Sequence, residues 1–163
     1  MSQELYFLRS SEQKIVKDMM EYAHPLDAKN SIYTDFYGLT AKDLGIYVLV
    51  ENKIAGAIWT RRFNQDHNAS AFVDENTPVM SVAILPEFKG EEIGSFMMNQ
   101  FLQEAGALYE QISIDISAKP KSIAFYEKFG FLRVASSDIL VKKLEKKEVF
   151  RPSDGYDPTR WMD

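Results

Sequence analysis

Residues 79–94, VMSVAILPEFKGEEIG, predict a buried strand that turns through a short loop into a helix. The first seven residues are mainly apolar and β-branched, which is typical of a buried strand. Pro86 has no N–H to donate to a sheet, so we expect the strand to end there. Further on, apolar residues recur at intervals of four and three, which marks one face of a helix. They are Ile93, Met97, Phe101, Ala105 and Leu108.

Two glycines, Gly90 and Gly94, lie where the chain turns into this helix. The first turn of a helix leaves backbone N–H groups without partners, and these groups carry a partial positive charge. A loop that contains glycine can admit a phosphate group to such donors. The start of the helix is therefore a candidate phosphate-binding site.

The same stretch resembles the cofactor motif of the GCN5-related N-acetyltransferase (GNAT) superfamily. In that motif a Val/Ile-x-Pro strand end is followed by Arg/Gln-x-x-Gly-x-Gly/Ala, and residues 84–86 and 89–94 match it here. Residues 122–131, SIAFYEKFGF, are similar to a second family element, A-x-x-F-Y-E-K-x-G-F. The two elements in this order are far more specific than a lone pair of glycines.

Three positions depart from the family pattern. Glu92 replaces the middle glycine, Lys89 replaces the Arg/Gln, and Lys119 replaces an asparagine that commonly precedes the tyrosine by seven residues. A solvated carboxylate beside a pyrophosphate would repel it by about 1 kcal/mol. The glutamate can instead point to water while its N–H still donates. The departures therefore bear on how tightly the cofactor would bind, and less on whether the chain resembles the family.

The resemblance implies a fold and a cosubstrate. The fold would be α+β in three layers, with a mixed, mostly antiparallel sheet that is flanked by helices and splayed between its fourth and fifth strands. The cosubstrate would be acetyl-CoA, with its pantetheine arm on residues 83–85, its thioester oxygen at the N–H of Ile84 and its pyrophosphate over residues 89–95. The candidate cofactor-binding residues are Ala83, Ile84, Leu85, Lys89, Gly90, Glu91, Glu92, Ile93, Gly94, Ser95, Lys119, Phe125 and Tyr126.

The resemblance also implies the chemistry. Tyr126 matches the tyrosine that commonly protonates the departing thiolate, although a packed helix aromatic is the alternative. Asp115 is the candidate general base, because some relatives carry a glutamate near there; a solvated carboxylate is at least as consistent with the pattern, and many relatives use a water chain. The expected activity is acetyl transfer from acetyl-CoA to a primary amine by direct attack.

Two other functions stay open at this point. One is a non-catalytic acyl-CoA-binding or regulatory module on the same fold, which Glu92 and Lys119 motivate. The other is a partner-binding protein that uses an aromatic tail, residues 146–163, as its contact. We expect residues 1–145 to form the GNAT domain and the tail to dock on that domain or on a partner, with disorder as the competing interpretation.

The composition of the chain limits its possible partners and chemistry. The 163-residue chain has a net charge of −5 and no cysteine, which argues against nucleic acid or an anionic membrane as partner and excludes a cysteine nucleophile. We expect a cytoplasmic protein that acts on a small-molecule or peptide amine, with a homodimer as one possible assembly. His24 and His67 are isolated in the sequence, so we expect surface histidines and no metal site.

The rest of the chain gives a coarse secondary structure. We expect strands at residues 5–8, 111–117, 131–135 and 139–144, and a hairpin at 46–50 and 54–61. Helices are expected at residues 15–23 and 120–129, and a further short helix within residues 26–44. That last segment contains Ile32, Tyr33, Phe36 and Tyr37 at helical spacing, which we interpret as core or as the lining of an acceptor pocket.

Overall fold

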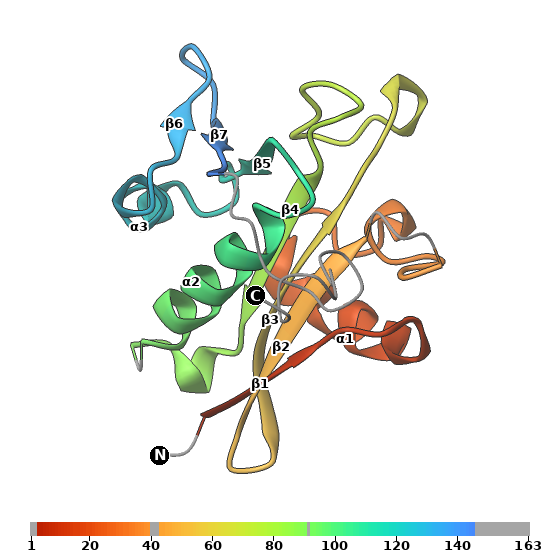
Figure 1. Cartoon of the computed structure of the whole chain (residues 1–163), viewed down its shortest axis with the longest axis vertical. Coiled ribbons are helices and arrows are strands. Elements are labelled where there is room, and N and C mark those ends of the chain that lie inside the picture. Colours follow the sequence, from red (N-terminus) through yellow and green to blue (C-terminus); the bar gives the residue numbers. More distant parts are fainter. Residues whose placement is uncertain (1–2, 40–42, 91, 146–163) are drawn as a thin grey trace, which may run out of the picture.

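The computed structural model describes residues 3–39, 43–90 and 92–145. Figure 1 shows a sheet with α1 on one face and α2 on the other. The strands are β1 (Gln3–Phe7), β2 (Leu44–Val50), β3 (Lys53–Arg61), β4 (Val79–Ile84), β5 (Gln111–Asp115), β6 (Leu132–Arg133) and β7 (Ile139–Lys143), and the α-helices are α1 (Gln13–Ala23), α2 (Ile93–Ala105) and α3 (Ile123–Lys128). Single 3-10 turns lie at Ser10–Glu12, Ser31–Tyr33, Gln65–His67, Pro86–Phe88 and Pro120–Ser122.

The described strands form one seven-stranded sheet in the order β1-β2-β3-β4-β5-β7-β6. Every neighbouring pair is antiparallel except β4 and β5, which are parallel and share a single register pair, Val79 with Ser113. Beyond that pair the two strands separate, as Figure 1 shows. The predicted mixed, mostly antiparallel sheet with a splay between its fourth and fifth strands is therefore confirmed.

Each face of the sheet carries its own apolar core. On one face, Met97 and Phe101 of α2 are fully buried against residues of β2, β3 and β5. On the opposite face, Val16 and Met20 of α1 pack with Trp59 of β3. Since β3 buries side chains on both faces, it runs through the centre of the molecule. The three-layer arrangement follows from these two cores.

The segment between α1 and β2 differs from the expectation. The predicted short helix is wrong: in the described part of residues 26–44 there is only the 3-10 turn at Ser31–Tyr33. Phe36 and Gly38 adopt φ angles of 59° and 82°, which a right-handed helix cannot contain. Tyr33 and Tyr37 are buried in the core, whereas Phe36 is exposed. The core interpretation therefore holds for the two tyrosines.

A buried ion pair holds this segment against the sheet. Nε of Arg61 lies 3.4 Å from Oδ1 of Asp43, and the two side chains are only 14% and 4% exposed. The guanidinium also donates to the carbonyl oxygens of Ile32 and Asp35. Arg61 at the end of β3 thus fixes the backbone path that the local sequence does not specify.

The predicted tail, residues 146–163, lies outside the described residues, so its docking and the domain boundary stay predictions. None of the helices among the described residues is long and apolar enough to cross a membrane.

Candidate active site

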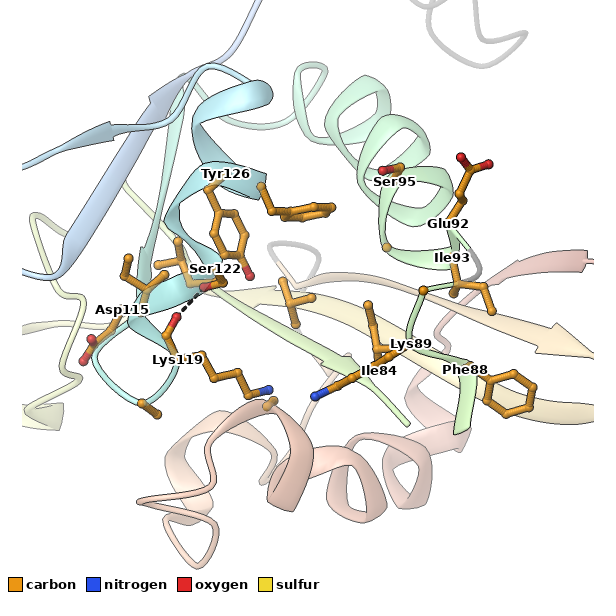
Figure 2. Close-up of a pocket in the computed structure, with 18 residues that line it drawn as sticks. Ile84, Phe88, Lys89, Glu92, Ile93, Ser95, Asp115, Lys119, Ser122 and Tyr126 are labelled. Atoms are coloured by element: carbon orange, nitrogen blue, oxygen red, sulfur yellow. Dashed lines mark hydrogen bonds between the residues drawn. The ribbon is translucent and has the colours of Figure 1, made fainter. Parts of the chain in front are cut away.

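A cleft of about 420 Å³ opens where β4 and β5 separate. Its walls come from both strands, from the start of α2 and from α3, and Figure 2 shows the side chains that surround it. The lining residues are Ala23, Val82, Ile84, Phe88, Lys89, Gly90, Glu92, Ile93, Gly94, Ser95, Ile114, Asp115, Ile116, Ala118, Lys119, Ser122, Phe125 and Tyr126. Residues of both sequence motifs, 84–94 and 122–131, therefore line one cavity.

Main-chain groups of β4 face this opening. The N–H of Leu85 donates to the carbonyl of Ala55 at 2.9 Å, so Leu85 is bonded toward β3. Because N–H and C=O groups alternate between the two edges of a strand, those of Ile84 and Val82 point to the opposite edge, where β5 has moved away. The main-chain groups of Ala83 and Leu85, which were predicted to bind the cofactor, thus point toward β3. Those of Val82, which was not among the predicted residues, point to the opening.

The first turn of α2 forms one end of the cleft. Gly90 has a φ of 87° and Glu92, the residue before the helix, has a φ of 63°. A Cβ atom on Gly94 would lie 3.0 Å from Cδ1 of Ile84, so the glycine keeps this end of the cleft open. The first N–H groups of the helix have no intrahelical partners and are available to a ligand. Glu91 lies outside the described residues.

The carboxylate of Glu92 does not enter the cavity. The residue is exposed, and Figure 2 shows its carboxylate pointing away from the side chains of Tyr126 and Lys119. Its backbone adopts the left-handed conformation that the family glycine would adopt without strain. The substitution therefore changes the charge and the backbone energy of the loop while leaving the cavity open.

Two lysines, Lys89 before α2 and Lys119 after β5, line the cleft. Figure 2 shows the side chains of Lys89 and Lys119 extending toward each other. Burial lowers the pKa of Lys119, and the charge of Lys89 lowers that pKa further. The Lys119 ammonium donates to the carbonyl of Tyr22 at the end of α1, and neither lysine forms an ion pair with another described residue. An anion placed between the two would relieve their repulsion.

Tyr126 lies deep in the cleft. Only 6% of the residue is exposed, and its ring makes edge contacts with Phe125 and Phe131. Figure 2 shows the hydroxyl directed into the cavity, and no described residue forms a hydrogen bond with it. Burial raises the pKa of the hydroxyl well above its usual value. The group stays protonated at neutral pH and is available as a proton donor.

Asp115 stands at the end of β5, but its carboxylate already has a structural partner. Its Oδ1 accepts a hydrogen bond of 2.8 Å from the N–H of Ser117. Figure 2 shows the carboxylate turned away from Tyr126 and the lysines. The structure thus brings Asp115 to the wall of the cleft without directing its carboxylate into the cavity.

His24 differs from its sequence-based interpretation as a surface residue. It directly follows α1, and its Nε2 lies 2.7 Å from Oγ of the buried Ser81 in β4. The ring also stacks on Tyr33, with the two ring centroids 4.1 Å apart. Nothing in the local sequence marks this histidine, because its partners are 57 residues and nine residues away along the chain.

Comparison with known proteins gives a consistent result. A family model described as an acetyltransferase (GNAT) domain matches residues 42–133, which is more than half of the chain. A search of curated proteins finds no match.

Solved structures with similar folds span nearly the whole chain. They include the ribosomal-protein-S18-alanine N-acetyltransferase from Escherichia coli, at 13% identity and a TM-score of 0.61, with 96% of this chain and 100% of that one covered. A phosphinothricin acetyltransferase from Sinorhizobium meliloti, in complex with AcCoA, is 17% identical with a TM-score of 0.61 and 97% coverage of both chains. An IAA acetyltransferase from Bacillus cereus has a TM-score of 0.64 at 13% identity and covers 88% of this chain and 100% of its own. At these identities the likeness concerns the fold.

Proposed function

Because the chain belongs to the GNAT acetyltransferase family, we propose that it transfers an acetyl group from acetyl-CoA to a primary amine by direct attack. The observation that carries the proposal is the cleft at the β4–β5 splay. It combines unpaired main-chain groups of β4, the start of α2, two lysines and the hydroxyl of Tyr126 around one cavity.

The residues present fit acetyl-CoA as cosubstrate. The N–H groups at residues 93–95, together with Lys89, would hold the pyrophosphate, since helix N-termini and ammonium groups both bind phosphate. The main chain of Ile84 and Val82 would pair with the amides of the pantetheine arm. The apolar walls, which include Ile93, Ile114 and Phe125, would exclude water from that arm. The bound thioester supplies the activated acetyl group.

The chain's own groups can meet three needs of the reaction. Cleft walls position the thioester beside the incoming amine. The N–H of Ile84 points to the splay and would stabilise the oxyanion that develops on the carbonyl oxygen. Tyr126 would give its proton to the departing thiolate, since its hydroxyl is protonated and faces the cavity. With no cysteine in the chain, the amine attacks the thioester directly rather than through an acyl-cysteine.

The acceptor must also lose a proton. Asp115 would have to turn its carboxylate and give up its hydrogen bond to Ser117 to reach the cavity. Its role as general base therefore requires a side-chain movement on acceptor binding. The chemical class that fits the reaction is an amine on a small molecule or a peptide.

Isothermal titration with acetyl-CoA, followed by measurement of thiol release across a panel of amines, tests this proposal. We expect saturable binding and release of CoA that depends on the amine. Tight binding with no thiol release across the panel would favour the non-catalytic acyl-CoA-binding module. Absence of binding would contradict both functions.

A further inference from the structure

The ammonium of Lys119 lies on the α1 side of the cleft, whereas the proposed phosphate site lies on the α2 side. The ammonium donates to the carbonyl of Tyr22 in α1, and Ala23 at the end of that helix also lines the cleft. Because α1 and α2 cover opposite faces of the sheet, the first N–H groups of α2 open into the cleft from the other face. Figure 2 shows the Lys119 side chain on the side of the cavity nearest α1, away from Ser95.

Backbone hydrogen bonds fix the point from which this side chain starts. The N–H of Lys119 donates to the carbonyl of Ile116 at 2.9 Å. Its own carbonyl accepts the N–H of Ser122 at 3.0 Å and the hydroxyl of Ser122 at 2.6 Å. Pro120 follows directly and begins the 3-10 turn that leads into α3. Lys119 is therefore a donor that is already in position at the wall of the cleft, and a ligand would pay little to order it.

The positive charge of Lys119 has no anionic partner among the residues that the structure describes. An ammonium has three N–H donors, and the carbonyl of Tyr22 takes one of them. Burial in the cleft lowers the pKa of Lys119, and the charge of Lys89 lowers that pKa further. The carboxylate of Asp115, on the same wall, points away from the cavity. An anionic group of a ligand would accept the remaining N–H donors and offset both effects.

We infer that the acceptor is a small amine that also carries a carboxylate or a similar oxyanion, and that Lys119 binds this anionic group. The inference rests on the proposed function, because it names the class of acceptor for the same cleft. The family resemblance placed Lys119 with the cofactor, but the phosphates are assigned to Lys89 and to the start of α2, on the other face. A small molecule fits this site because the cleft of about 420 Å³ must also hold the pantetheine arm.

A purely structural role for Lys119 makes a different prediction. Cations are favourable near the last carbonyls of a helix, and the bond from Lys119 to Tyr22 is of this kind. Loss of that bond would affect every acceptor alike, because it would alter the end of α1. Loss of an anion-binding group would affect only those acceptors that carry an anion. Acceptors that differ in this one feature therefore separate the two roles.

Thiol-release kinetics with paired amines test the inference in the parent protein. The pairs are glycine and glycinamide, β-alanine and its amide, and γ-aminobutyrate and its amide, which place the carboxylate at increasing distances from the amine. Rates are compared at equal concentrations of the unprotonated amine. We expect kcat/KM to be about 10- to 100-fold higher for the carboxylate in at least one pair, which is the range that a hydrogen bond between charged groups provides. Equal or faster turnover of the amide in every pair would overturn the inference.

Substitution of Lys119 shows whether this residue is the source of the preference. In Lys119→Gln, kcat/KM for the preferred carboxylate should fall about 10- to 100-fold, while kcat/KM for the matching amide changes by less than threefold. Lys119→Arg keeps the charge and should retain most of the preference for the carboxylate. The matched control is Lys121→Gln, since Lys121 is exposed two residues further on and does not line the cleft. We expect its preference to equal that of the parent.

The remaining outcomes separate this inference from the proposed function. An equal loss for carboxylate and amide in Lys119→Gln would overturn the inference and make the lysine structural. A weaker Kd for acetyl-CoA in that variant, with the preference for the carboxylate unchanged, would overturn it in favour of a cofactor contact. Both results would leave the proposed function intact, because the parent would still release thiol. Absence of thiol release with every amine would instead contradict the proposed function and the inference with it.

Discussion

Removing one atom, the hydroxyl oxygen of Tyr126, should affect catalysis and stability in different ways. Tyr126→Phe removes a hydroxyl that faces the cleft and has no hydrogen-bond partner among the described residues. Leaving a polar group buried without a partner costs about 1–3 kcal/mol, and the cavity beside this hydroxyl reduces that cost. We therefore expect the free energy of unfolding to be unchanged or to rise by about 1 kcal/mol, which shifts Tm upward by about 2–4 °C.

Turnover should respond in the opposite direction. General acid catalysis typically contributes about 10²- to 10⁴-fold, but a thiolate is a good leaving group that needs less help. We expect kcat to fall about 10- to 100-fold in Tyr126→Phe, which corresponds to about 1.4–2.7 kcal/mol of activation free energy. The Kd for acetyl-CoA should change by less than threefold, because the ring and its packing against Phe125 and Phe131 remain.

Tyr109→Phe is the matched control for this prediction. Tyr109 is also about 5% exposed, but its hydroxyl accepts a hydrogen bond of 3.2 Å from Thr60 and lies outside the cleft. We expect this variant to lose about 1 kcal/mol of stability and to keep its kcat. Thiol-release kinetics and thermal unfolding measure both quantities. Equal turnover in Tyr126→Phe and the parent would refute a role for the hydroxyl, and a large loss of stability would show that it is structural.

Three further substitutions test the cleft and the fold. Glu92→Gly replaces a non-glycine residue that has a left-handed backbone conformation and removes a negative charge. Calorimetry in low salt should therefore show acetyl-CoA binding about fivefold more tightly, and weaker binding would give the glutamate a structural role. Lys89→Gln should weaken binding about 3- to 10-fold and reduce its salt dependence, and an unchanged Kd would remove Lys89 from the phosphate site. Asp43→Asn leaves Arg61 buried without its charge partner and should lower the free energy of unfolding by about 3 kcal/mol, measured with denaturant. The control Asp18→Asn breaks an exposed ion pair and should lower it by less than about 0.5 kcal/mol. Similar losses in the two variants would contradict a stabilising role for the buried pair.

The elements that the sequence predicted correctly are those with strong local patterns. Three such patterns each indicate a buried face directly. They are the apolar strand that ends before Pro86, the helical spacing from Ile93, and the alternation of Ile112, Ile114 and Ile116. The two motifs placed Tyr126 and Lys89 around one cavity because their spacing reflects a common fold.

The parts that were missed depend on contacts distant in sequence. The path of residues 31–38 is held by Arg61, so helical spacing of its aromatics was misleading. His24 gains its environment from Ser81 and Tyr33, and neither leaves a pattern around the histidine. The direction of the Asp115 carboxylate is set by its bond to Ser117, which strand alternation alone does not reveal.

A crystal structure of the protein with acetyl-CoA tests the central claim most directly. We predict pyrophosphate oxygens within hydrogen-bond distance of the N–H groups at residues 93–95, and the acetyl oxygen within that distance of the N–H of Ile84 or Val82. Binding of acetyl-CoA at a different surface, with the space between β4 and β5 left unoccupied, would contradict the account.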